Sequence, residues 1–81
     1  MAYIIAAEDK GGTGTYYLTL TTQAGELDWE MHEEKAMPID SIHNARKTLN
    51  FVISVATREH WVGDYRFNIS EAKQGNNEIR Y

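Results

Sequence analysis

The chain has 81 residues, no cysteine and a formal net charge of −4. A chain of this length builds one small hydrophobic core, so we expect a single domain over residues 1–81. The absence of cysteine excludes a disulfide framework, a thiolate zinc site and a nucleophilic thiol, and it fits a reducing compartment. The excess of acidic residues argues against the binding of nucleic-acid phosphates as the primary role.

The charge is unevenly distributed along the chain. Residues 1–40 contain eight acidic and two basic residues, whereas residues 41–81 contain four acidic and six basic ones. The segment Met1–Ala7 lacks the basic leader and the long apolar core of a signal peptide, and no apolar run approaches the ~20 residues that span a bilayer. We therefore expect a cytoplasmic protein that does not interact with membranes.

The first half of the chain has the pattern of β-strands. Residues 2–8 form a short apolar run with β-favouring side chains, and a glycine-rich turn follows at 9–14. In residues 15–22, alternation places Tyr16, Leu18 and Leu20 on one face and Tyr17 on the other. Residues 26–32 alternate again, so a second hairpin is expected after the turn at 23–25.

The period changes to that of a helix after Pro38. The apolar stripe consists of Ile42, Ala45, Leu49, Val52, Ile53 and Ala56. Asp40 is the expected N-cap and Gly63 the expected terminator. Residues 64–71 alternate once more, with Tyr65, Phe67 and Ile69 predicted inward and Arg66, Asn68 and Ser70 outward.

These elements predict an α+β fold in the order βββαβ, with a possible fifth strand at residues 78–81. We expect a mainly antiparallel sheet of four or five strands with the single helix on one face. Because only one apolar helical stripe is present, the second face of the sheet is expected to be polar or bound to a partner.

The sequence offers no arrangement typical of catalysis. His32 begins a run that starts like a zinc-protease helix, but no second histidine follows four residues later. The segment Gly11–Gly14 has no Lys-Ser/Thr pair after it and leads into a strand, so a hairpin turn explains it better than a phosphate cradle. We therefore expect no enzyme activity, no cofactor and no metal site.

The most distinctive feature is an acidic stretch from residue 26 to residue 34. On a strand, Glu26, Asp28 and Glu30 project to one face at a spacing of about 6.6–6.8 Å, and Glu33 and Glu34 follow. A linear row of carboxylates can imitate a phosphate backbone and bind a basic groove. Tyr17 is expected beside this row and suits a binding surface. The alternative is a solvated strand face that keeps the sheet soluble.

The opening strand Ala2–Ile5, a hairpin, the helical segment Ser41–Lys47 and the closing strand Tyr65–Ile69 resemble the small single-domain proteins of bacteriophages, of which anti-CRISPR proteins are the best-known functional group. The resemblance implies inhibition of a host nuclease complex by binding, often at its nucleic-acid groove. It assigns no role to a particular residue.

Three functions are compatible with these features. The first is a phage-type inhibitor that binds a basic surface of a host defence protein through residues 26–34. The second is a homo-oligomeric accessory protein that pairs through its open sheet face or edge. The third is direct nucleic-acid binding through aromatic and arginine side chains on the sheet, which the net negative charge disfavours.

Overall fold

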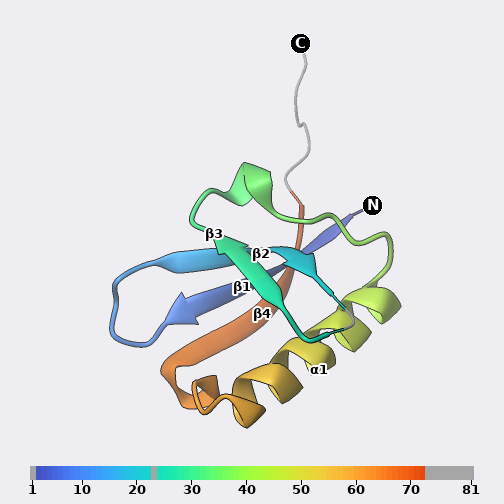
Figure 1. The fold of residues 1–81 in the computed structure, drawn as a ribbon. Helices are drawn as coiled ribbons and strands as arrows, with labels where there is room; N and C mark the ends of the chain where they lie inside the picture. Colours follow the sequence, from blue (N-terminus) through green and yellow to red (C-terminus); the bar gives the residue numbers. More distant parts are fainter. Residues whose placement is uncertain (1, 23, 73–81) are drawn as a thin grey trace.

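The computed structural model describes residues 2–22 and 24–72. Its elements, in chain order, are β1 (Tyr3–Asp9), β2 (Thr15–Thr21), β3 (Leu27–Glu30), the 3-10 helix η1 (Glu33–Lys35), α1 (Ile42–Arg58), the 3-10 helix η2 (Val62–Asp64) and β4 (Tyr65–Glu71). The four strands form one antiparallel sheet in the order β3-β2-β1-β4, with α1 packed beside it (Figure 1). The predicted α+β fold is confirmed. The possible fifth strand at 78–81 lies outside the described residues.

Strand β1 is central because its sequence is apolar on both faces. Ile4, Ile5, Ala6 and Ala7 are all buried. β1 pairs with β2 on one side and, over its whole length, with β4 on the other. A strand covered on both faces favours a continuous apolar run over an alternating one.

The core lies between the sheet and α1. Its buried cluster consists of Ile5, Leu18, Ile39, Ala45 and Val52. Phe67 and Ile69 pack against it from β4, while the alternate residues of that strand are exposed. The predicted inward and outward faces of residues 64–71 are thus confirmed. Helix α1 contacts mainly β1 and β4, which leaves the β2–β3 side of the sheet less covered.

A β-bulge changes the predicted facing of Leu20. Leu18 pairs with Trp29 but Leu20 pairs with Asp28, so β2 contains one more residue than β3 between these two pairs. Leu18 is 1% exposed in the core, whereas Leu20 lies on the face away from α1 and is 47% exposed. The prediction that Leu20 shares the face of Leu18 is therefore wrong, because the bulge reverses the alternation.

Helix α1 begins at a different cap from the one predicted. Ser41, not Asp40, is the N-cap: its backbone is extended and its hydroxyl accepts from the Asn44 N–H at 3.1 Å. The Asp40 carboxylate instead accepts from the Asn44 side-chain amide at 3.0 Å. The apolar stripe also shifts, because Ile42 is 39% exposed and Val55, which was not assigned to the stripe, is buried.

The helix ends before the predicted Gly63. Glu59 is the C-cap and His60 follows with a left-handed φ of 69°. The Trp61 N–H donates to the Ala56 carbonyl at 2.9 Å and the His60 N–H to the Thr57 carbonyl at 3.2 Å, the two bonds of a Schellman motif. A histidine thus takes the position at which the sequence pattern favours glycine, and the motif fixes the direction in which Trp61 leaves the helix.

Candidate functional site

The acidic stretch lies along an edge of the sheet. Among the described strands, β3 pairs only with β2, and its alternation directs Leu27 and Trp29 toward the core and Asp28 and Glu30 to the opposite face. Both carboxylates are exposed. Tyr17 is the direct cross-strand partner of Glu30, as the predicted pairing requires.

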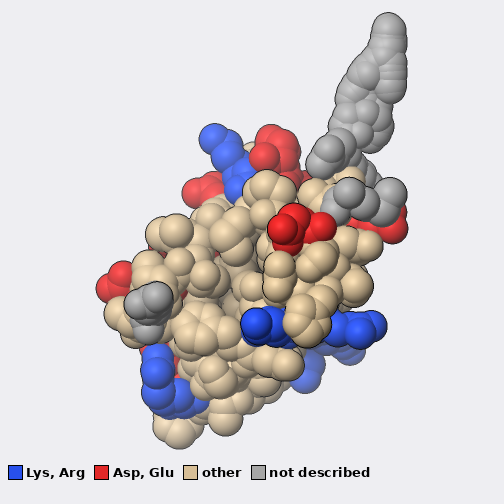
Figure 2. Space-filling model, turned by 90° about the vertical axis from the view of Figure 1, so that its right-hand side faces the viewer, with Lys and Arg blue, Asp and Glu red and all other residues tan. Residues whose placement is uncertain are grey.

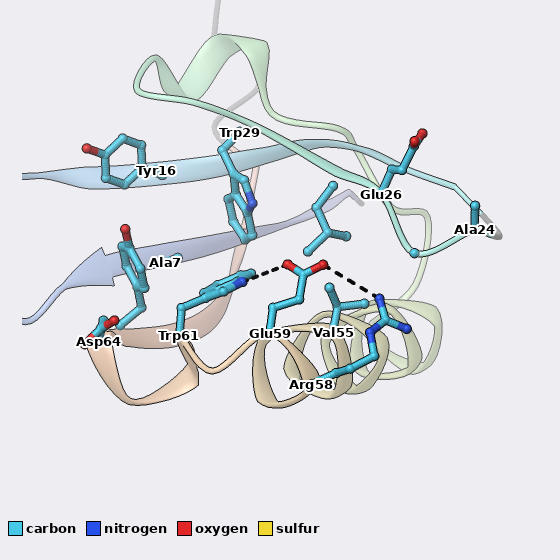
Figure 3. Close-up of a pocket in the computed structure, with 13 residues that line it drawn as sticks. Ala7, Tyr16, Ala24, Glu26, Trp29, Val55, Arg58, Glu59, Trp61 and Asp64 are labelled. Carbon is cyan, nitrogen blue, oxygen red and sulfur yellow. Dashed lines mark hydrogen bonds and ion pairs between the residues drawn. The ribbon is translucent and has the colours of Figure 1, made fainter.

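The remaining predicted carboxylates lie outside β3. Glu26 precedes the strand in the hairpin, where its backbone bonds with Thr22 and its side chain points away from α1 (Figure 3). Glu33 and Glu34 begin the short helix η1. η1 contacts β2, and the Met37 N–H donates to the Leu18 carbonyl at 2.8 Å just after it.

Two ion pairs occur within residues 2–22 and 24–72. They join Arg58 to Glu59 at 3.8 Å and Arg66 to Glu8 at 4.0 Å, and neither includes Asp28 or Glu30. On the face in Figure 2, acidic side chains gather mainly in the upper half and basic ones mainly in the lower half, at the height of α1. The separation of charge along the sequence is therefore preserved in space on this face.

A second candidate site is an open cleft of about 790 Å³ between the β2–β3 side of the sheet and the end of α1 (Figure 3). Ala7, Leu27 and Val55 contribute apolar surface to it. Its aromatic lining comes from three elements and the helix exit: Tyr16, Trp29, Trp61 and Tyr65. All four aromatic residues are only half-buried.

The four rings form a continuous chain. The centroid distances are 6.2 Å from Tyr16 to Tyr65, 5.7 Å from Tyr65 to Trp61 and 6.3 Å from Trp61 to Trp29. The interplanar angles of these pairs are 79°, 88° and 85°, so every contact is edge-to-face. Successive rings consequently present their faces in different directions around the cleft.

Charged groups complete the lining. The Trp61 indole N–H donates to one oxygen of Glu59 at 3.1 Å, and the other oxygen is 3.8 Å from Arg58. Arg58 lies against Gly25, whose φ is +88° and whose added Cβ would stand 2.8 Å from the guanidinium. The positive φ favours glycine, and any larger residue would displace the end of the Arg58 side chain. Glu26 and Asp64 are also among the residues that line the cleft, although the Glu26 side chain points away from α1.

Sequence reasoning found this cleft only in part. The alternation of residues 15–22 placed Tyr16 on the face of Leu18, and the alternation of residues 64–71 placed Tyr65 inward. Sequence reasoning missed Glu59 and Arg58, because their approach to Trp61 and Gly25 depends on the hairpin and the helix end meeting in space.

No protein-family model matches the chain, and no curated protein or solved structure matches it. Among residues 2–22 and 24–72, no helix is long and apolar enough to cross a membrane. In the same part of the chain, no three His, Asp or Glu side chains are grouped to hold a metal ion.

Proposed function

We propose that this chain is a non-enzymatic inhibitor that binds a basic, nucleic-acid-binding surface of a partner protein through the β3 edge and the residues that flank it. The supporting observation is that Asp28 and Glu30 stand exposed on one face of an edge strand, outside both ion pairs of the described chain. The proposed setting is the host cytoplasm, with the chain acting as a phage-encoded anti-defence protein of the anti-CRISPR kind.

The geometry suits an extended basic groove. Alternate residues of a strand are separated by about 6.6–6.8 Å, which gives a linear display of carboxylates. Glu26 extends the display at the hairpin and Glu34 at η1, while Tyr17 adds contact area beside Glu30. An exposed edge also presents unpaired backbone groups to which a partner strand can bond.

The test is to remove two charges without changing side-chain shape. In Asp28→Asn/Glu30→Gln, we expect recovery of the partner from nuclease-treated host lysate to fall sharply. With a purified partner, affinity should fall at least tenfold, about 1.4 kcal/mol.

The matched control is Asp40→Asn/Glu71→Gln, which removes two exposed acidic charges elsewhere and should bind as the original chain does. Equal binding by the edge variant and the control would exclude the proposal.

A homodimer is the second candidate, and exposed Leu20 beside Asp28 is the observation that favours it. An exposed apolar side chain on a sheet face can anchor a second copy. Light scattering over a concentration series separates the two: a dimer that Leu20→Ser dissociates supports this candidate, and a monomer at high concentration eliminates it.

A further inference from the structure

The aromatic cleft is built unlike a closed core. Tyr16, Trp29, Trp61 and Tyr65 are only half-buried although they are four large aromatic side chains in contact with one another. The reason is the position of α1, which packs mainly on β1 and β4 and stops at Arg58. Beyond that point, the rings contact one another while the cleft beside them stays open.

The aromatic lining makes the cleft attractive to a cation. Each aromatic face carries a partial negative charge, and a cation within ~6 Å of a ring centroid is attracted to it. Four half-buried rings line the same open volume, so a cation placed there lies close to aromatic surface.

The charged lining points to the same sign of ligand. Three acidic residues, Glu26, Glu59 and Asp64, and one basic residue, Arg58, line the cleft. The Glu59 carboxylate is held at Trp61, whereas the Glu26 side chain points away from α1 (Figure 3). The Glu59–Arg58 separation of 3.8 Å is longer than the ~2.7–2.9 Å of a charge-assisted hydrogen bond, so Glu59 retains acceptor capacity. In Figure 3, Arg58 lies on one side of Glu59, and Tyr16 and Trp61 lie on the other, so Arg58 does not fill the aromatic part.

We propose that this cleft binds one arginine side chain of the partner protein. A planar guanidinium can stack on an indole face and direct its N–H fork at a carboxylate, whereas a lysine ammonium acts as a compact, strongly hydrated point charge. Trp61 and Glu59, joined by the 3.1 Å hydrogen bond, supply both groups in a fixed relation. The inference rests on the proposed function, which supplies a basic partner, and Glu26 at the hairpin connects the cleft to the acidic edge.

Tryptophan fluorescence can follow binding in the cleft, because both tryptophans of the chain, Trp29 and Trp61, line it. Intrinsic fluorescence is titrated with an N-acetylated, C-amidated Gly-Arg-Gly tripeptide. The control ligand contains citrulline, which has the shape of arginine without its charge, and a third ligand contains lysine. We expect a saturable response to the arginine peptide and affinity at least tenfold lower for the other two.

Glu59→Gln tests the carboxylate without removing the acceptor for the Trp61 N–H. We expect this variant to bind the arginine peptide about tenfold more weakly, which corresponds to about 1.4 kcal/mol. Glu71→Gln removes the same charge at the far end of β4 and should bind normally. Amide NMR spectra establish that both variants are folded. An equal response to arginine and citrulline, or unchanged affinity in folded Glu59→Gln, overturns the proposal.

The two proposals fail separately. If Asp28→Asn/Glu30→Gln loses the partner but arginine peptide does not bind, only the cleft assignment is wrong. If the peptide binds with the expected selectivity while the edge variant retains the partner, the cleft assignment holds and the acidic-edge function is wrong.

Discussion

Asp9 shows how a single side chain organises the turn between β1 and β2. One carboxylate oxygen accepts from the Gly11 N–H at 2.9 Å and the other from the Thr13 hydroxyl. The hydroxyl bond, followed by the Gly11 bond, lowers the pKa of Asp9 below its ordinary value of 3.8. The glycine-rich segment is therefore a carboxylate-centred hairpin turn.

Protonation of the Asp9 carboxylate should lower the stability of the fold in acid. Because its folded-state pKa is lowered, the stabilisation is complete above pH 3.8 and is lost as pH falls through the lower folded value. We expect Thr13→Val to raise the pKa of Asp9 toward 3.8, measured by NMR titration of the carboxyl carbon. Thr15→Val, which lies outside the turn bonds described, should leave it unchanged. A Thr13→Val titration identical to that of the original chain would refute this role.

His60 is the one non-glycine residue with a positive φ among residues 2–22 and 24–72. Left-handed backbone costs an L-residue about 1–2 kcal/mol, and glycine avoids most of this cost. We expect His60→Gly to raise the free energy of unfolding by up to about 1 kcal/mol in urea denaturation.

Gly63→Ala is the control for His60→Gly. Gly63 lacks a positive φ, and no atom lies within 4 Å of a Cβ added there, so the substitution should leave the free energy of unfolding nearly unchanged. Strong destabilisation by Gly63→Ala would restore Gly63 as the residue that the helix end requires.

At the scale of elements, the bulge in β2 decides which side chains reach the core. It directs Leu18 inward and Leu20 outward although two positions separate them. It also places the apolar Leu20 beside Asp28 on the surface proposed to bind a partner. One extra residue in a strand therefore changes both the core and the candidate interface.

The same change, leucine to alanine, made separately at positions 18 and 20 tests the bulge. We expect Leu18→Ala to destabilise the fold by about 2–5 kcal/mol, because it leaves a cavity in the core. Leu20→Ala should cost about 0.5 kcal/mol or less, as an exposed position does. The measurement is the free energy of unfolding in urea by tryptophan fluorescence and circular dichroism. Equal costs for the two would contradict the observed register.

At the scale of the whole molecule, acidic and basic side chains lie mainly in different halves of the face shown in Figure 2. Asp28 and Glu30 lie on the edge strand, whereas Arg46 and Lys47 are exposed on α1. Such a distribution orients the chain as it approaches a basic partner and increases the association rate. The effect acts over roughly the Debye length, ~10 Å at 0.1 M salt.

We expect the association rate with a purified basic partner to fall about tenfold or more between about 0.05 and 0.3 M salt, because exposed charges are screened. Stopped-flow fluorescence measures it. Asp28→Asn/Glu30→Gln should show a flatter dependence on salt than Asp40→Asn/Glu71→Gln. The same steep dependence in both variants would mean that the edge does not direct association.

Much of the architecture follows from local sequence. The apolar run of β1, the alternation of β4 and the helical period of α1 specify their elements, because each requires a periodic face to be buried. The pairing of Tyr17 with Glu30 follows from the hairpin between β2 and β3. The acidic edge was thus predictable, although Glu26, Glu33 and Glu34 lie outside the strand itself.

The tertiary structure decided the features that depend on contacts between distant segments. The bulge at Leu20 is an adjustment to the pairing of β2 with β3, and the left-handed His60 is a helix-end geometry that alternation does not reveal. The cleft exists because α1 packs mainly on β1 and β4, while Trp29 and Trp61, 32 positions apart in the sequence, meet beside the end of α1. A periodic pattern defines which face of an element is buried, but only packing determines what that face contacts and where a gap remains.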